Sequence, residues 1–428
     1  MNQTALEHEF VETTVRLKRR DERVAILGLG YVGLPLAEAF ADQFEWVTGY
    51  DISEDRIDDI RRNAPPSSLN LTTSAGNLRD ATLYIVAVPT PITPFNQPDF
   101  SPLEAACTTI ARYLQKDDMV VFESTVYPGA TEEVCAPLLA EYSGLSAIED
   151  FSIGYSPERI NPGDQVHGLK SIKKLVAADS HAALNRAVSL YASVLDHAPV
   201  TCPSIKVAEA AKVLENTQRD VNIALMNEVS SLWDKIGISS FDVLAAAGTK
   251  WNFNPFHPGL VGGHCIATDP HYLSALANRE GVTPALIETA RRVNAGLPER
   301  IKSRLFQHLA TLGSGAKVVQ LGLTFKENVA DLRGSLALEL AEDLAQLNLN
   351  FSCVEPFLTS PQKNALKLPF ARVDDLDEVD ALILAVPHQS FLKERLWTDR
   401  VSENALVMDL RSIIQTQDVP GGCTLWRL

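Results

Sequence analysis

Short, continuously apolar segments alternate with longer amphipathic segments between about residues 20 and 200. Five of the apolar segments are candidate strands, at 23–28, 46–51, 81–89, 119–125 and 151–155. Strands in which successive residues are all apolar are typical of a parallel sheet that is covered by helices on both faces. The pattern therefore predicts a doubly wound α/β domain that ends at about residue 200.

A long helix is predicted next. No Pro or Gly interrupts residues 204–236, and Pro203 before this stretch and Gly237 after it are typical helix boundaries. Such a helix would span roughly 50 Å, which is more than one small domain needs. We therefore expect it to connect two domains and, through its surplus apolar face, to support a dimer.

The strand pattern returns in the last third of the chain, at 316–322, 350–355, 380–387 and 405–409. The two strand-rich regions also resemble each other, because VAILGLG from Val24 is similar to VVQLGL from Val318. We expect two related α/β domains on either side of a helical middle region. The predicted boundaries are a polar tail at 1–20, an N-terminal domain at 21–203, a helical domain at 204–300 and a C-terminal domain at 301–428.

Composition narrows the classes of function. The chain has 428 residues and a net charge of −16, which disfavours nucleic acid and anionic membranes as partners. It lacks both an apolar run of the roughly 18 residues that a membrane helix requires and an N-terminal secretion signal. Its six cysteines are scattered without metal-binding spacing. We expect a cytoplasmic protein with reduced thiols, no metal and no membrane insertion.

A glycine-rich loop follows the first predicted strand directly and precedes a helical segment. The loop has glycines at 28, 30 and 33, with Tyr31 and Val32 between the last two. In a βαβ unit this spacing permits a tight turn, close approach to a pyrophosphate, and packing of helix against strand. Asp51 ends the second strand, where a carboxylate binds ribose hydroxyls and repels a 2′-phosphate. The pattern predicts a Rossmann-like domain that binds NAD.

Two alternatives remain at this loop. Arg56 is close enough in sequence to serve an NADP enzyme, although stacking on adenine is the preferred role. The loop could also bind nothing, because the glycine spacing alone is weakly specific; FAD is less favoured than NAD.

A second informative loop, at 258–270, surrounds a single cysteine with glycines. Cys265 is therefore accessible, and Asp269 would share a face with it if a helix began at the cysteine. Lys212 and Asn216 are also four residues apart, on the long helix. An ammonium beside a thiol lowers the thiol pKa and stabilises an oxyanion. Taken singly, however, Cys265 could be a packed thiol and Lys212 a solvated surface group.

Seven ordered motifs resemble those of the nucleotide-sugar 6-dehydrogenases, which include UDP-glucose dehydrogenase. The resemblance extends from about residue 22 to the end and is strongest to the branch that acts on UDP-N-acetylhexosamines in capsule and O-antigen synthesis. The motifs are GLGYVGLPLA (28–37), VPTP (88–91), ESTVYPG (123–129), YSPERINPGD (155–164), KVAEAAKVLENTQRDVNIALMNE (206–228), GLVGGHC (259–265) and FKEN (325–328).

This resemblance implies a four-electron oxidation of the sugar C6 alcohol to a carboxylate with two NAD⁺ and one water. It implies that Cys265 forms a thiohemiacetal and then a thioester, that Asp269 helps to deprotonate the alcohol, and that Lys212 and Asn216 stabilise the oxyanions. Glu158 and Thr125 would position the hydrolytic water. Further cofactor contacts would come from Thr90, Thr125 and Arg333, and substrate contacts from Glu158, Arg159, Ile160, Lys212, Asn216, Phe256, His257, Gly259, Phe325 and Lys326.

Some positions depart from the branch pattern. His257 replaces a common Arg, and Ala267, Thr268 and His271 alter the segment after Cys265. Because the nucleophile, lysine and carboxylates are present, these changes bear on which sugar is bound. UDP-glucose and UDP-N-acetylmannosamine are alternative substrates. A single-step β-hydroxyacid dehydrogenase would need neither Cys265 nor a second α/β domain, and an NAD-binding regulatory protein would need no catalytic residues.

Overall fold

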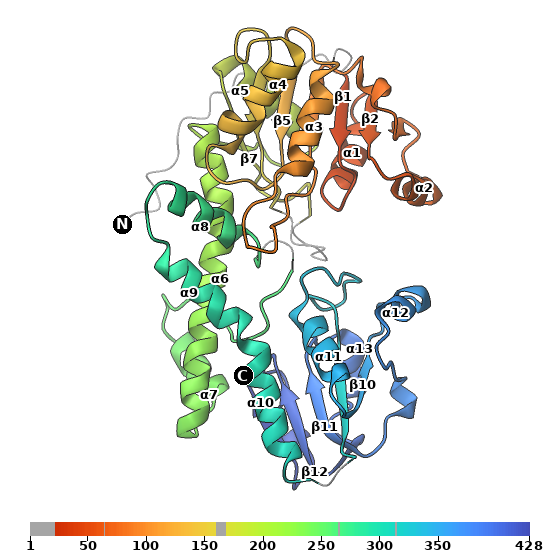
Figure 1. Ribbon diagram of the computed structural model, residues 1–428, viewed down its shortest axis with the longest axis vertical. Helices are drawn as coiled ribbons and strands as arrows, with labels where there is room; N and C mark the ends of the chain where they lie inside the picture. The colour runs from red at the N-terminus through yellow and green to blue at the C-terminus, as the bar shows by residue number, and fades with distance from the viewer. Residues whose placement is uncertain (1–21, 64, 160–167, 264–265, 313–314) are drawn as a thin grey trace. The chain divides into compact units, whose positions relative to one another are not determined.

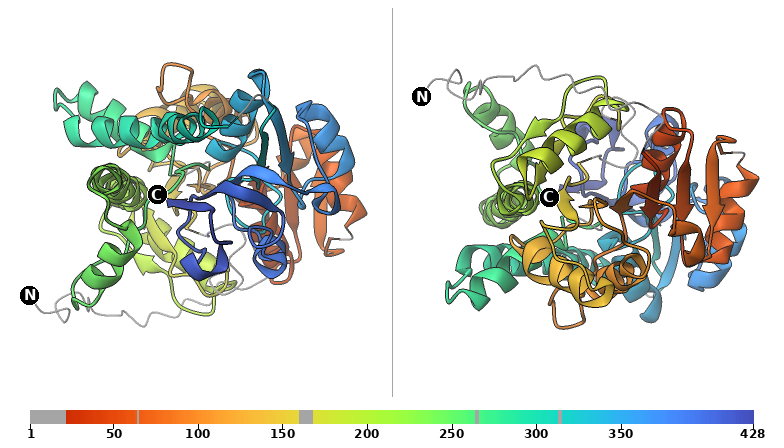
Figure 2. Two further views of the ribbon diagram at one scale, coloured as in Figure 1. Left: turned by 90° about the horizontal axis from the view of Figure 1, so that it is seen from below. Right: turned by 90° about the horizontal axis from the view of Figure 1, so that it is seen from above.

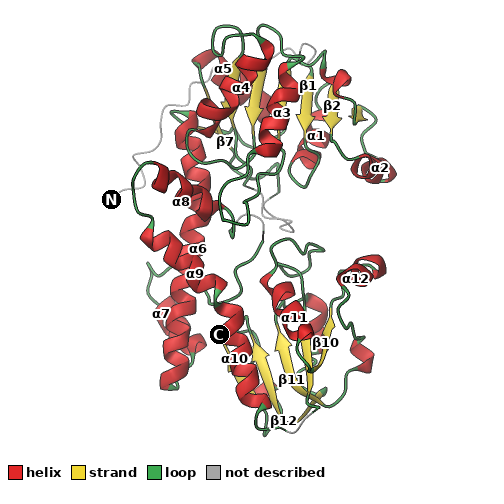
Figure 3. Ribbon diagram, viewed as in Figure 1, coloured by secondary structure: helices red, strands yellow, loops and turns green. Residues whose placement is uncertain are grey.

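A computed structural model describes residues 22–63, 65–159, 168–263, 266–312 and 315–428. The chain forms two compact units, of which the first ends at Val213 and the second begins at Leu214. Figure 1 traces both units along the chain, and Figure 3 distinguishes their strands from their helices. The predicted tail at 1–20 lies outside the described residues.

The first unit is built around one sheet. Its elements are β1 (Val24–Leu27), α1 (Gly33–Ala41), β2 (Val47–Tyr50), α2 (Glu54–Arg62), β3 (Leu69–Thr72), η2 (Ala75–Leu78), β4 (Leu83–Val86), α3 (Ser101–Ala111), β5 (Met119–Phe122), η3 (Thr131–Cys135), α4 (Ala136–Ser143), β6 (Ser152–Tyr155), β7 (Leu175–Ala178), α5 (His181–Ala192) and β8 (Val200–Thr201).

The strand order in this sheet is β3-β2-β1-β4-β5-β6-β7-β8. Its first six strands are parallel and have the order of a dinucleotide-binding domain, whose ligand crevice lies at the carboxyl ends of β1 and β4. β7 pairs antiparallel with β6. The predicted α/β class and all five predicted strands of this region are confirmed.

Alternate residues of each central strand enter two different cores, which explains the continuously apolar strands. Ala25 and Leu27 pack on the face covered by α3 and α4. Val24 and Ile26 pack on the opposite face, against α1, α2 and α5. Both faces are therefore dry, as expected for a parallel sheet between helical layers.

The long helix α6 (Ile205–Ile236) matches the helix predicted at 204–236. It is the yellow-green to green helix that stands vertical in Figure 1, and the two views of Figure 2 look along it. Its first residues belong to the N-terminal unit and the rest to the second unit. Every helix in the described ranges is too short or too polar to cross a membrane.

The second unit combines helices with a five-stranded parallel sheet of order β10-β9-β11-β12-β13. Its elements after α6 are α7 (Ser240–Gly248), α8 (Asp269–Arg279), α9 (Ala285–Ala295), α10 (Leu297–Leu309), β9 (Lys317–Leu321), α11 (Leu336–Gln346), β10 (Asn350–Val354), α12 (Ser360–Leu366), η4 (Val373–Asp375), β11 (Val379–Leu384), α13 (Gln389–Glu394), β12 (Val401–Asp409), η5 (Thr416–Asp418) and β13 (Thr424–Arg427).

The two sheets share a local design after their first strands, as the sequence similarity predicted. Gly28 donates its N–H to the carbonyl of Tyr50, and Gly322 does the same to Val354. Both glycines have positive φ, 90° and 88°, and a Cβ on either would clash with the neighbouring strand end. Each sheet therefore makes the same tight turn toward its crevice.

Two expectations need correction or addition. The sequence spacing allows a helix that begins at Cys265, but α8 begins at Asp269, and 266–268 form a turn. Pro270 suits the first turn of a helix, where no backbone donor is required. Four strands, β3, β7, β8 and β13, were not predicted, because they have only two to four residues and little hydrophobic pattern of their own.

Candidate functional site

The glycine loop after β1 is shaped for close approach of a ligand. A Cβ at Gly33 would lie 1.9 Å from the carbonyl oxygen of Gly28, so only glycine allows α1 to pack here. A Cβ at Gly30 would meet nothing within 4 Å. Gly30 therefore borders open space at the N-terminus of α1, where backbone N–H groups and the helix dipole attract a pyrophosphate.

Asp51 and Arg56 hold this loop by its backbone. Asp51 Oδ2 accepts the N–H of Leu29 at 2.9 Å, and Arg56 Nε donates to the carbonyl oxygen of Leu29 at 2.8 Å. Both polar groups of Leu29 are thereby fixed before a ligand binds. Asp51 remains partly exposed beside the loop, which suits ribose hydroxyls. Stacking of Arg56 on adenine remains a prediction.

The other predicted cofactor residues lie around this turn. Val32 directly precedes α1 and, like Tyr31, is half-buried. Thr90 is buried in the segment after β4, at the carboxyl edge of the sheet. A tight glycine turn, an open Gly30 and an adjacent carboxylate, Asp51, fit NAD, because the carboxylate repels a 2′-phosphate.

The loop that carries Thr125 is attached to α6 through a buried carboxylate. Glu209, which is fully buried, accepts the backbone N–H groups of Gly129 at 2.5 Å and Thr131 at 2.9 Å. Burial raises the pKa of Glu209, while these donors oppose the rise. The contact fixes the end of the 123–129 loop to α6 one turn before Lys212.

Lys212 and Asn216 lie one turn apart on α6, as predicted. Lys212 is 6% exposed, so it is not a solvated surface lysine. Asn216 donates its Nδ2 hydrogen to Asp269 Oδ2 at 2.6 Å, and Asp269 is 2% exposed. The structure therefore brings the half-buried Asn216 and the buried Asp269 together, through the start of α8 rather than through a helix beginning at Cys265.

The glycine loop before Cys265 is fastened at both ends. Asn227 Oδ1 accepts the N–H of Gly259 at 2.8 Å, and Asn227 Nδ2 donates to the Gly259 carbonyl at 3.2 Å. Gly263 donates its N–H to the carbonyl of Gly334 at 2.9 Å. Phe256 is half-buried and His257 exposed. His264 and Cys265 lie outside the described residues.

The predicted residues of the C-terminal sheet flank the same glycine loop. The Phe325 ring would lie 2.8 Å from a Cβ on Gly263, so these two residues are in close contact. Lys326 is half-buried beside Phe325, and its carbonyl accepts the Thr324 hydroxyl at 2.8 Å. Arg333 is exposed and forms an ion pair with Asp331 at 2.5 Å.

Glu158 and Arg159 follow β6 in the N-terminal unit. Glu158 is 8% exposed, and its Oε1 accepts the Arg159 N–H at 2.6 Å. Arg159 donates from Nη1 to the carbonyl of Lys173 at 2.6 Å. Ile160, the third residue predicted in this segment, lies outside the described residues.

Sequence reasoning missed Glu209 and Asn227 as residues that shape the site. The signal was present on α6, where buried polar residues recur on one face at spacings of three, eight and seven residues. They are Glu209, Lys212, Asp220 and Asn227. Polar side chains on a buried helix face require partners, which marks such residues as structural or functional contacts.

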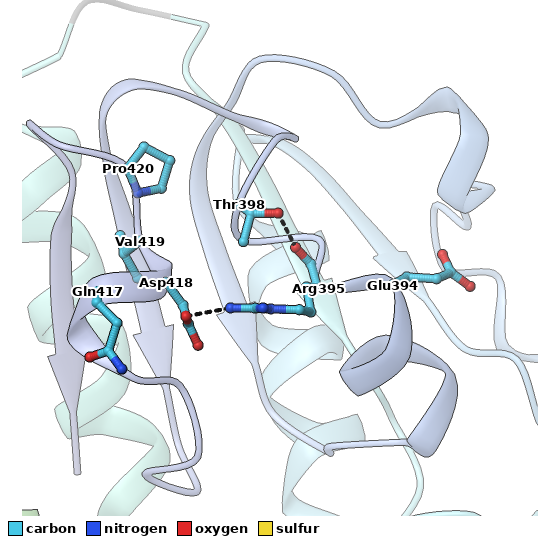
Figure 4. Close-up of a pocket in the computed structure, with 7 residues that line it drawn as sticks. All are labelled: Glu394, Arg395, Thr398, Gln417, Asp418, Val419 and Pro420. Carbon is cyan, nitrogen blue, oxygen red and sulfur yellow. Dashed lines mark hydrogen bonds and ion pairs between the residues drawn. The ribbon is translucent and has the colours of Figure 1, made fainter.

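A separate hollow of about 530 Å³ lies in the C-terminal sheet region between α13 and η5 (Figure 4). Arg395 and Asp418 form an ion pair across it, and Thr398 donates to the carbonyl of Arg395 at 2.8 Å. None of the predicted site residues lines this hollow. Among the described residues, no group of His, Cys, Asp and Glu is arranged to hold a metal ion.

Comparison with protein families identifies the chain. Three successive domains of the UDP-glucose/GDP-mannose dehydrogenase family match: the NAD binding domain at 22–195, the central domain at 206–296 and the UDP binding domain at 319–416. The chain belongs to this family. It is an NAD-dependent nucleotide-sugar dehydrogenase, so the predicted cofactor, enzyme class and family resemblance are confirmed.

Individual relatives support this family assignment. Protein CapL of Staphylococcus aureus is 42% identical, over 95% of this chain and 100% of that protein. UDP-N-acetyl-D-glucosamine 6-dehydrogenase of Pseudomonas aeruginosa is 42% identical, over 87% of this chain and 92% of that protein. The structure of UDP-D-ManNAc dehydrogenase from Pyrococcus horikoshii has a TM-score of 0.84 at 30% identity, covering 95% and 98% of the two chains.

Gly30→Ala is expected to weaken NAD binding by at least about tenfold without destabilising the enzyme. The new methyl group meets no protein atom, but it enters the space through which the loop backbone approaches a pyrophosphate. The measurements are the Kd for NAD by fluorescence titration and the Tm. Gly33→Ala is the matched comparison, because its methyl group clashes with Gly28 and should lower the Tm. Unchanged NAD affinity in Gly30→Ala would contradict this assignment.

His271 predicts a pH dependence of stability. Burial, and then the charge of Arg291, lower its pKa from 6.5 to about 4. The unfolded chain therefore binds a proton below pH 6.5 that the folded chain does not, so stability falls as the pH drops from 6.5 toward 4. His271→Tyr should reduce this loss by about 1–2 kcal/mol, after allowance for partial exposure. Denaturant unfolding of the wild-type and His271→Tyr proteins between pH 4 and 7 measures the free energy of unfolding. An equal dependence of this free energy on pH in both proteins would show the prediction to be wrong.

Proposed function

We propose that this enzyme oxidises the C6 alcohol of a UDP-N-acetylhexosamine, UDP-GlcNAc or UDP-GalNAc, to the carboxylate. The reaction consumes two NAD⁺ and one water, and releases two NADH for each uronic acid. The observation that carries the proposal is the hydrogen bond of Asn216 to the buried Asp269, on the helix that begins just after the Cys265 loop. The motif sequence supplies every residue type that two consecutive oxidations require.

Asp269 acts first in the proposed reaction by accepting the proton of the C6 hydroxyl through a water or through Lys212, as the hydride leaves C6. The Cys265 thiolate then adds to the aldehyde carbon and forms a thiohemiacetal. Loss of a second hydride from this carbon gives a thioester, so the aldehyde does not escape between the two steps. NAD⁺ supplies the hydride acceptor for both oxidations.

Lys212 and Asn216 are proposed to stabilise the oxygen that becomes negative at each stage. A buried ammonium interacts with an oxyanion more strongly than a solvated one does. Glu158 and Thr125 are proposed to position the water that cleaves the thioester, after which Cys265 leaves as a thiolate. The low exposure of Glu158 and the attachment of the Thr125 loop to α6 support these positioning roles.

The identity of the sugar rests on the relatives. Proteins named UDP-N-acetyl-D-glucosamine 6-dehydrogenase are 40–42% identical to this chain, whereas those named UDP-N-acetyl-D-mannosamine dehydrogenase are 31–33% identical. Arg159, Ile160, His257, Gly259, Phe325 and Lys326 are the proposed nucleotide-sugar contacts, with Arg333 toward the cofactor. The proposed division of labour is NAD binding at 21–203, the Cys265 loop and dimer contacts at 204–300 and UDP binding at 301–428.

The proposed location is the cytoplasm. The five cysteines in the described ranges are free thiols, which suits a reducing compartment.

The decisive experiment measures NADH released per UDP-sugar consumed by the purified enzyme with UDP-GlcNAc, UDP-GalNAc, UDP-ManNAc and UDP-glucose. Two NADH per molecule of an N-acetylhexosamine substrate supports the proposal. One NADH indicates simple alcohol oxidation, and none with any sugar indicates a binding protein. Preference for UDP-glucose or UDP-ManNAc would contradict the proposed sugar.

Cys265→Ser should lower acid formation by more than about a thousandfold, because an alkoxide nucleophile is far less available than a thiolate at neutral pH. The Kd for NAD should stay within about twofold of the wild-type value. Cys202→Ser, at a partly buried cysteine of the described ranges, is the control and should retain full turnover. Full turnover by Cys265→Ser would contradict the covalent route.

We also propose a homodimer that forms through α6. Large apolar residues repeat along its exposed face, including Leu214, Leu225, Leu232 and Ile236, each more than half exposed. Their spacings of eleven, seven and four residues place them in one stripe. A stripe of this kind on an otherwise polar helix is typical of a helix-packing interface.

Leu225→Asp with Leu232→Asp should convert the dimer to a monomer, because two carboxylates would be desolvated at the interface. Light scattering coupled to size exclusion measures the mass. Arg219→Gln, at an exposed position of the same helix outside the stripe, is the control and should leave the mass unchanged. A wild-type mass of one chain would contradict the proposed dimer.

A further inference from the structure

A buried ion pair lies beneath the segment that carries Glu158. Lys174 Nζ is 2.6 Å from Glu123 Oε2, and the two side chains are 2% and 0% exposed. Tyr191 donates its hydroxyl hydrogen to Glu123 Oε1 at 2.5 Å, and its ring centroid lies 5.1 Å from the lysine nitrogen. The reaction proposed above uses none of these three residues.

The lysine holds the backbone just before Glu158. Besides Glu123, Lys174 Nζ contacts the carbonyl oxygens of Ser156 and Pro157, each at 3.3 Å. An ammonium has three N–H donors, and these three acceptors account for all of them. Two of the three hydrogen bonds thus fix consecutive peptide groups that lead into Glu158.

Neighbouring contacts limit the segment further. Ser156 donates its hydroxyl to the carbonyl of Leu175 at 2.8 Å, and Arg159 donates to the carbonyl of Lys173 at 2.6 Å. Lys174 lies between these two acceptors in sequence. The chain on both sides of Glu158 is therefore attached to residues 173–175, where β7 begins, and Lys174 supplies the contacts at the centre.

Stability alone is a poor explanation for this pair. Desolvating an ammonium and a carboxylate costs several kcal/mol per ion, and apolar side chains of similar volume often replace such pairs without loss of stability. Apolar side chains could not, however, hold the carbonyls of Ser156 and Pro157. Burial raises the pKa of Glu123, Lys174 opposes the rise, and the charge of Glu158 adds to it.

We propose that Lys174, held by Glu123 and Tyr191, is a positioning residue that fixes Glu158 for its role with the hydrolytic water. The proposal rests on the function proposed above for Glu158. Lys174 does not touch substrate; it acts through the backbone of Ser156 and Pro157. A shift of about 1 Å in a positioned group can reduce a rate by about a hundredfold, so loss of these contacts should affect turnover more than binding.

The test is a double-mutant cycle in the full-length enzyme, assayed for acid formation with whichever of the four UDP-sugars is turned over fastest. Lys174→Met should reduce kcat about 10- to 100-fold and leave the KM for NAD within about twofold. In a Glu158→Gln background, Lys174→Met should reduce kcat by less than about twofold, because the carboxylate that Lys174 positions is already absent. Lys173→Met, at the exposed neighbouring lysine, should retain wild-type kcat.

Two further variants separate positioning from folding. Lys174→Arg retains a cation that can donate to the same carbonyls, and it should recover kcat to within about fivefold of the wild-type value. Glu123→Met/Lys174→Met leaves no unpaired charge, so it keeps the test available if Lys174→Met alone does not fold. It should show the same loss of kcat as Lys174→Met.

Each outcome of the double-mutant cycle supports or overturns the proposed positioning role of Lys174. An equal loss in both backgrounds would indicate a general structural role and overturn the proposal, as would wild-type kcat in Lys174→Met or in the double methionine variant. Wild-type kcat in Glu158→Gln would instead contradict the role of Glu158 in the proposed function. A loss confined to the wild-type background, with recovery by Lys174→Arg, supports the positioning role.

Discussion

The candidate site residues depend on one constraint: buried polar side chains on α6 require hydrogen-bond partners. Glu209 finds its donors in the backbone of Gly129 and Thr131, and Asn227 satisfies both backbone groups of Gly259. A buried carboxylate or amide left unpaired would cost on the order of 1–3 kcal/mol or more. Within the first unit, Glu209 therefore fixes the loop that carries Thr125, and within the second unit Asn227 fixes the loop that leads into Cys265.

A second constraint comes from the repeated turn after β1 and β9. In the first sheet, Asp51 accepts the N–H of Leu29 and remains partly exposed. In the second, Glu355 accepts the N–H of Leu323 in the same way but is 1% exposed and lies 3.0 Å from His388 Nε2. The same turn thus leaves a carboxylate available for ribose in the first sheet and covers it in the second.

Much of the fold followed from the sequence because its signals are local. Continuous apolar strands require two covered sheet faces, and an uninterrupted helix needs only the absence of Pro and Gly. The glycines at 28, 30 and 33 have three different environments, as the motif predicted. The short strands β3, β7, β8 and β13 could not be predicted in this way, because tertiary pairing rather than hydrophobic period decides them. The start of α8 follows from Pro270 in its first turn, which hydrophobic period does not register.

The ion-pair partners of buried charged side chains could not be predicted from the sequence either. Lys174 lies in an ordinary strand-like segment, and Glu123 is separated from it by about fifty residues. They meet because β5, which Glu123 follows, and β7, which Lys174 precedes, pair with opposite sides of β6. The antiparallel β7 matters here, because it reverses direction and so delivers its first residues to the carboxyl end of β6. In a parallel arrangement, Lys174 would lie at the opposite edge of the sheet, and the segment before Glu158 would lack its cation.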